Sequence, residues 1–127
     1  MLDTHAWVWW VSAPDRLSSV AREAIDRAER VGICTISCWE VTMLAIRGRL
    51  QLALETELWV RRGLAHPRTV ELPLTSEVAV RAALLRSQGL ESDPADEIIY
   101  ATARANGSLL VTRDAALREF DPRATVW

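Results

Sequence analysis

The chain has 127 residues and a mass of 14.2 kDa, and half of its residues are apolar while a quarter are charged. This length and composition predict one globular domain, residues 1–127, and exclude a disordered, collagen-like or low-complexity protein. The formal net charge of −2 gives no general attraction for nucleic acid, so a polyanionic partner would be held by a local basic cluster or through metal ions.

The predicted elements alternate between strands and helices along the chain. Apolar residues at helical spacing mark the helices, and short β-branched runs bounded by turn residues mark the strands. The expected elements are a short strand at 1–3, an aromatic-rich stretch at 7–11, a turn at 14–17, a helix at 18–30, a strand at 33–37, a helix from 37 to about 48, a helix at 55–65, a strand at 69–74, a helix at 75–86, a helix from 93 to about 107, a strand at 108–112, a helix at 115–120 and an edge strand at 124–127. This order predicts an α/β fold with a mostly parallel central sheet of about five strands flanked by helices.

Two of the helix starts carry a specific signal. Ser37 and Glu40 have the spacing of a capping box, in which the serine and the glutamate each satisfy a free backbone N–H group. Asp93 followed by Pro94 is typical of a helix N-terminus, because aspartate caps and proline is tolerated at the first helical position. These starts put Glu40 and Asp96 in the first turns of their helices.

The absence of lysine and the small number of cysteines limit the possible reaction mechanisms and indicate the cellular compartment. All 15 basic residues are arginine, so mechanisms that need a lysine are excluded. Cys34 and Cys38 lie four positions apart, which is neither a redox spacing nor half of a zinc pattern, and we expect both to be reduced. The sequence shows no signal peptide and no apolar run near the ~18 residues of a membrane span, so we expect a cytoplasmic protein without a membrane segment.

Four acidic residues fall at the ends of the predicted elements. Asp3 and Asp114 follow strands, and Glu40 and Asp96 open helices. Because ligands of open parallel sheets bind beyond the carboxyl ends of the strands, we expect these four carboxylates to converge on one rim. Glu40, Asp96 and Asp114 alone could each be only a helix cap or a charge near a helix dipole, whereas a carboxylate that ends a central strand, as Asp3 does, has little structural use. The joint pattern carries the signal. A divalent cation stabilises such a cluster, and Mg²⁺ or Mn²⁺ suits oxygen ligands.

Taken together, the motifs resemble the PIN domain, and more narrowly the VapC-type toxins of bacterial type II toxin–antitoxin pairs. The matching stretches span essentially the whole chain; they are Leu2-Asp3-Thr4-His5-Ala6-Trp7, Ser37-x-x-Glu40, Asp93-Pro94-Ala95-Asp96 and Leu110-Val111-Thr112-Arg113-Asp114. The Asp-Pro-x-Asp helix start followed by the Thr-x-Asp strand end is the specific part. The resemblance implies a three-layer PIN-like fold.

An activity and a set of site residues follow from this resemblance as expectations. It implies an endoribonuclease that depends on Mg²⁺, with Mn²⁺ as a substitute, and that hydrolyses RNA with a metal-activated water. The implied catalytic acids are Asp3, Glu40, Asp96 and Asp114, of which Asp3, Asp96 and Asp114 would be the metal ligands. Glu40 would hold the metal or the attacking water, and Thr4 and Thr112 would position a ligand or a water. Arg113 is either a contact to the scissile phosphate or a solvent-facing arginine.

The resemblance further implies three partners, which are an RNA substrate, a cognate antitoxin whose C-terminal segment lies near the active site, and a second copy in a homodimer. Trp7, Trp9 and Trp10 are either anchors of such an interface or ordinary core residues, whereas Trp59 and Trp127 are expected to be structural. The arginine pairs Arg47/Arg49 and Arg61/Arg62 either form solvated faces or flank a path for RNA.

The chain departs from the family pattern in three places. Only Met1 and Leu2 precede Asp3, so we expect the first strand to be truncated and the native strand to begin upstream. Glu97 stands where relatives often have arginine, and Ala115 and Ala116 stand where many carry a further acid. These departures keep one alternative open, which is a catalytically inactive PIN-like module that binds or regulates.

Overall fold

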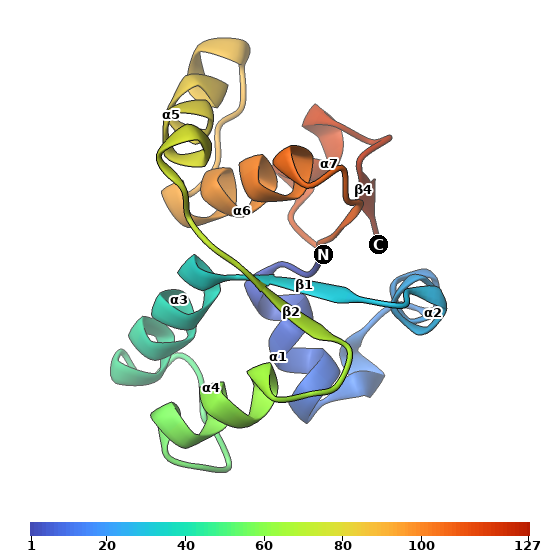
Figure 1. The fold of residues 1–127 in the computed structure, drawn as a ribbon, viewed down its shortest axis with the longest axis vertical. Coiled ribbons are helices and arrows are strands. Elements are labelled where there is room, and N and C mark those ends of the chain that lie inside the picture. The colour runs from blue at the N-terminus through green and yellow to red at the C-terminus, as the bar shows by residue number, and fades with distance from the viewer.

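The computed structural model describes residues 1–127 as seven α-helices around a parallel β-sheet (Figure 1). The helices are α1 (Thr4–Ser12), α2 (Ser19–Arg27), α3 (Thr35–Ile46), α4 (Thr56–Leu64), α5 (Ser76–Leu85), α6 (Pro94–Ala105) and α7 (Ala115–Phe120), with 3₁₀ turns η1 (Pro14–Arg16) and η2 (Arg86–Gln88). The strands are β1 (Val31–Cys34), β2 (Thr69–Leu72), β3 (Leu110–Val111) and β4 (Thr125–Val126).

A single residue joins two pairs of parallel strands into one sheet. β1 pairs with β2 and β3 pairs with β4, and Leu2 bridges Ile33 on one side and Val111 on the other. The backbone N–H of Leu2 donates to Gly32 over 3.0 Å, and the N–H of Asp3 donates to Val111 over 3.0 Å. The sheet order is therefore β2, β1, Leu2, β3, β4. The predicted α/β fold with a parallel sheet of about five strands is confirmed.

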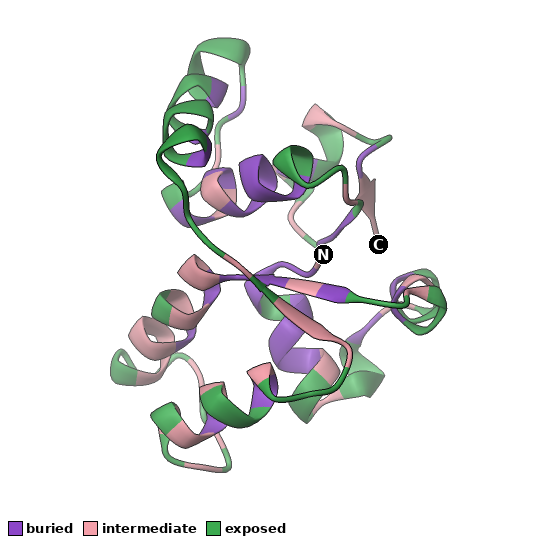
Figure 2. Ribbon diagram, in the orientation of Figure 1, coloured by how far each residue is buried: buried purple, intermediate pink, exposed green.

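Both faces of the sheet are covered by helices, which gives three layers. Alternate residues of a strand point to opposite faces, and Ile33 and Val111 accordingly pack with α1, α2 and α4, whereas Cys34 and Leu110 pack with α5, α6 and α7. Figure 1 shows the second group of helices above the β1–β2 pair and α1, α3 and α4 below it. Figure 2 shows buried residues concentrated on α1, α6 and β1, whereas β2 has none. None of the helices is long and apolar enough to cross a membrane.

The start of α3 differs from the sequence prediction. The strand predicted at 33–37 ends at Cys34, and α3 begins directly at Thr35 with no side-chain cap. Ser37 therefore lies inside the first turn, fully buried, and its hydroxyl has no hydrogen-bond partner. The capping box of Ser37 and Glu40 is wrong, because the helix starts without any gap after the strand.

The tryptophans near the N-terminus belong to the core. The aromatic-rich stretch at 7–11 is part of α1, in which Trp7 and Trp9 are almost fully buried, while Trp10 packs against His66. Trp59 is buried against Trp7, and its indole N–H donates to the hydroxyl of Ser12 over 3.0 Å. The interpretation of Trp7 and Trp9 as interface anchors is therefore wrong.

Candidate active site

The four predicted acids line one cavity of about 310 Å³ at the carboxyl ends of the central strands. The structure thus brings together side chains from four separate segments of the chain, which are Asp3, Glu40, Asp96 and Asp114. His5, Arg113 and Ala115 complete the wall. The convergence follows from the parallel sheet, because the residues that leave β1, Leu2 and β3 all emerge at the same edge.

Asp3 is the most deeply buried of the four acids, with 4% of its surface exposed. Its carboxyl accepts a hydrogen bond of 2.7 Å from the backbone N–H of Ala6 and thereby caps α1. Burial raises the pKa of Asp3, and hydrogen bonds from the Thr112 side chain and the backbone of Arg113 partly offset that rise. The Thr112 hydroxyl also accepts from the backbone N–H of Asp114 over 3.0 Å, so Thr112 connects two acids of the cluster.

Glu40 is held by a hydrogen bond from another element. It lies in the second turn of α3, and the Thr4 hydroxyl donates to its Oε2 over 2.6 Å. Thr4 is itself buried at the start of α1. One carboxylate oxygen of Glu40 is therefore fixed, and the other has no protein donor.

The charged form of Asp96 is destabilised by its surroundings. Burial, followed by the charges of Glu40, Asp114 and Asp3, raises its pKa to about 7. Its one side-chain partner is the Ser92 hydroxyl, which donates over 3.4 Å to Oδ2. Asp114, by contrast, caps α7 by accepting a 2.8 Å hydrogen bond from the backbone N–H of Leu117. At neutral pH the four acids therefore carry more negative charge than the surrounding side chains compensate.

Arg113 and His5 supply the basic groups of this cavity. The guanidinium of Arg113 lies over the ring of Trp9, 5.2 Å from its centroid, and forms no ion pair with the acids. His5 lines the cavity although it was not among the predicted site residues. The sequence signal for His5 was its position two residues after Asp3, which caps α1. Side chains of the first turn of that helix lie near the edge of the sheet at which the acids meet.

Two residues that depart from the family pattern, Glu97 and Ala115, add no acid to the cluster. Glu97 is buried outside the cavity and pairs with Arg86 over 2.8 Å. Ala115 lines the cavity without contributing a charge. The cluster thus consists of the four predicted acids alone.

The donor set fits a hard divalent cation. Its acidic side chains offer only oxygen ligands, and after burial the charges of the other acids contribute to the raised pKa of Asp96. No three acidic, histidine or cysteine side chains already surround one point closely enough to form a finished metal site. Mg²⁺ commonly keeps several waters and takes only one or two carboxylates directly, so water-bridged ligands suit a cavity of this width.

Comparison with known proteins gives one family and several relatives. The model of the PIN domain family matches residues 1–122. Ribonuclease VapC22 of Mycobacterium tuberculosis is 42% identical over 129 aligned positions, which cover 100% of this chain and 97% of that protein. Two solved structures share the fold over 98% of this chain. VapBC2 from Rickettsia felis, bound to a promoter DNA fragment, has a TM-score of 0.67, 16% identity and 95% coverage of its chain. FitAB bound to an IR36 DNA fragment has a TM-score of 0.61, 22% identity and 91% coverage.

Proposed function

Because the chain belongs to the PIN domain family, we propose that it is a metal-dependent ribonuclease that hydrolyses RNA phosphodiesters and acts as the toxin of a toxin–antitoxin pair. The observation that carries this proposal is the cavity in which Asp3, Glu40, Asp96 and Asp114 meet. The 42% identity to a protein named as a ribonuclease supports the same chemistry.

Each acid has a defined task in this proposal. Asp3, Asp96 and Asp114 would hold the divalent cation, directly or through water. Mg²⁺, or Mn²⁺ in its place, would lower the pKa of a bound water and stabilise charge on the phosphate. Glu40 orients the attacking water with the carboxylate oxygen that Thr4 leaves free. The water oxygen bonds to phosphorus and releases one proton to solvent, the bond between phosphorus and the leaving oxygen breaks, and that oxygen takes up a proton from solvent.

Two threonines and one arginine support these acids. Thr4 fixes the orientation of Glu40, and Thr112 holds Asp3 and Asp114 in register through its single hydroxyl. Arg113 contacts the scissile phosphate, since it is the arginine on the wall of the acidic cavity and has no carboxylate partner. Its guanidinium fork suits phosphate oxygens.

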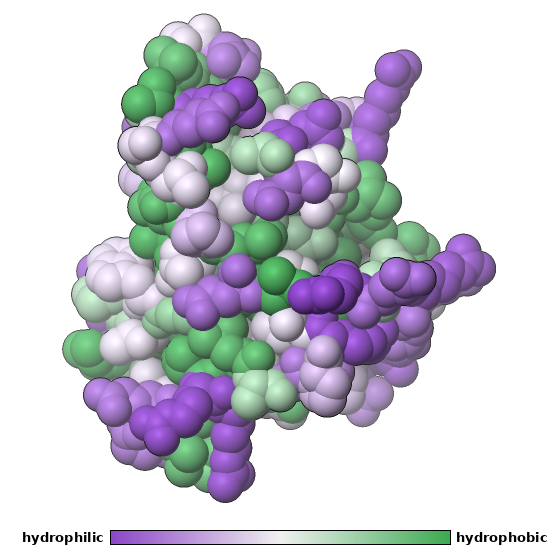
Figure 3. Space-filling view, viewed as in Figure 1, coloured by the Kyte–Doolittle hydropathy of each residue, from purple (hydrophilic) through white to green (hydrophobic).

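The proposed partners are RNA, a cognate antitoxin and a second copy of the chain. Val80 and Leu84 are exposed on α5, and Figure 3 shows apolar surface in that region at the upper left. Burial of this surface in a homodimer would remove it from water. Sedimentation of the purified chain measures this directly, and Leu84→Glu is expected to shift a dimer to monomer.

Replacement of one acid tests the nuclease. Expression of the wild type in a bacterial host, followed by sequencing of new RNA 5′ ends, is expected to show a few dominant cuts. Asp96→Asn is expected to remove them, because it takes a charged ligand from the cluster. The control is Asp15→Asn, since the Asp15 side chain is 99% exposed and does not line the cavity. Identical cuts from Asp96→Asn would refute the proposed site.

Metal removal gives an independent measurement. EDTA is expected to abolish cleavage, and added Mg²⁺ or Mn²⁺ to restore it. The cation binds only the folded site, so Mn²⁺ at about 100 times its dissociation constant should stabilise the wild type by about 2.7 kcal/mol. Asp96→Asn should lose most of that increase in melting temperature. If Mn²⁺ does not change the melting temperature of the wild type, the result favours the catalytically inactive PIN-like module.

A further inference from the structure

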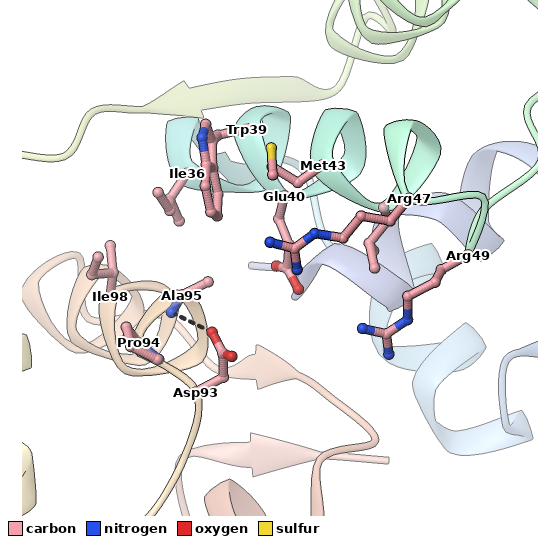
Figure 4. Close-up of a pocket in the computed structure, with 11 residues that line it drawn as sticks. Ile36, Trp39, Glu40, Met43, Arg47, Arg49, Asp93, Pro94, Ala95 and Ile98 are labelled. Carbon is pink, nitrogen blue, oxygen red and sulfur yellow. Dashed lines mark hydrogen bonds between the residues drawn. The ribbon is translucent and has the colours of Figure 1, made fainter.

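A second cavity lies beside the acidic one. It has a volume of about 480 Å³ and lies between α3 and the start of α6 (Figure 4). Glu40 lines both cavities, so the two spaces share a wall. A chain-like substrate that reaches the acids therefore has this cavity as an adjoining binding space.

Two arginines line this second cavity without being neutralised. Arg47 and Arg49 follow the end of α3, and neither forms an ion pair, although the carboxylates of Glu40 and Asp93 line the same space. In Figure 4 both guanidinium groups extend toward the side where these carboxylates lie. Their donors remain available to an anion, and a guanidinium fork matches phosphate oxygens.

The same cavity carries the most exposed aromatic side chain of the protein. Trp39 is 55% exposed, whereas Trp7, Trp9 and Trp59 are buried. Figure 4 shows the Trp39 indole projecting from α3 on the same side as Ile36. An exposed indole face stacks well on a nucleobase, and unpaired bases offer such a face while bases inside a duplex do not.

We propose that the cavity lined by Trp39, Arg47 and Arg49 binds single-stranded RNA next to the scissile phosphate. A base stacks on Trp39, and the flanking phosphates lie against Arg47 and Arg49. This inference rests on the proposed ribonuclease function and names the form of its substrate. It also explains how a chain with a net charge of −2 and four converging acids retains a polyanion, since the two arginines hold the neighbouring phosphates. The unpaired arginines and the shared Glu40 wall favour RNA over a protein segment at this place.

The test measures binding of a fluorescein-labelled oligouridylate in EDTA, with every protein carrying Asp96→Asn so that no RNA is cut. Arg47→Gln with Arg49→Gln is expected to weaken binding roughly 10- to 100-fold. It should also make the slope of log affinity against log salt shallower by about 1.4, because two phosphate contacts are lost. Trp39→Leu should weaken binding roughly 5- to 100-fold and leave that slope unchanged.

Matched controls separate this site from general charge effects. Arg61→Gln with Arg62→Gln removes the same charge from α4, away from both cavities, and should bind like the parent. A duplex of the same length should bind less tightly than the single strand and should not respond to Trp39→Leu. We expect these variants to melt at the same temperature as the Asp96→Asn parent. The side chains that they change are all exposed, namely Trp39, Arg47, Arg49, Arg61 and Arg62.

Three results would overturn the inference. If the Arg47/Arg49 variant binds with unchanged affinity and salt slope while the protein with its native Asp96 cuts RNA, this site is wrong and the nuclease stands. If the protein with its native Asp96 neither cuts nor binds RNA, both this inference and the proposed function are wrong. If Trp39→Leu disrupts self-association or a protein complex and leaves RNA binding intact, the cavity is a protein-docking surface.

Discussion

Asp96 links the acidic cluster to the stability of the metal-free protein. Its pKa of about 7 in the folded state lies well above the value of an unfolded aspartate, so its favourable contribution is complete below about pH 4 and is lost as pH rises through 7. We expect this loss to be about 2 kcal/mol after allowance for partial solvent exposure. Asp96→Asn should therefore melt at a higher temperature than the wild type at about pH 8 in EDTA, and the difference should vanish near pH 4.

The difference in melting temperature between the wild type and Asp96→Asn reports on Asp96. Burial lowers the pKa of the Met1 amino group to about 6, so that group makes stability rise with pH, opposite in sign to Asp96. The effect of Met1 is present in both proteins and cancels in their difference. Equal melting temperatures at about pH 8 would show that burial and the neighbouring acids do not raise the pKa of Asp96.

The sequence allowed the acids to be predicted but not most of their contacts. Asp3, Glu40, Asp96 and Asp114 could be located because each follows a strand or opens a helix in a parallel α/β order. The hydrogen bond from Thr4 to Glu40 joins residues 36 positions apart and depends on how α1 packs against α3. Such a contact has no local signature, and neither has the position of Arg113 over Trp9.

Among the helices, α4 approaches α1 through a glycine. A Cβ atom at Gly63 would lie 2.9 Å from Cζ2 of Trp7, and that indole is fully buried with no room to move. We expect Gly63→Ala to destabilise the protein by roughly 1–2 kcal/mol, because the overpacking outweighs the higher helix propensity of alanine. Chemical denaturation measures this, and in a Trp7→Leu background the same change should be neutral or stabilising.

α1 shows why one element could not be predicted as a helix. Its apolar residues lie on all sides, because the helix is buried from Ala6 to Trp9, so no periodic polar face marks it. Strands at residues 69–72, 110–111 and 125–126 fall inside their predicted ranges, since β-branched runs and nearby turns limit them. The β1–α3 junction was misplaced because Thr35 and Ile36 suit a strand as well as a helix.

For the molecule as a whole, we propose that residues 1–127 unfold as one unit, although the core lies in two layers. Five of the six tryptophans pack in or against the layer of α1, α2 and α4, whereas Tyr100, the single tyrosine, lies in the layer of α5, α6 and α7. Tryptophan fluorescence thus reports on one layer and far-ultraviolet circular dichroism on both. Coincident thermal transitions are expected, and two separate midpoints would indicate two domains.

The assembly of the acidic cavity from distant segments has a consequence for the order of events in folding. Asp3 reaches Asp114 because the backbone N–H of Asp3 donates to Val111 in β3, which joins an early and a late part of the sequence. Closing a loop over so many residues costs conformational entropy before the contact is made. The cavity therefore forms only with the complete sheet, and a partly folded chain holds its acids apart.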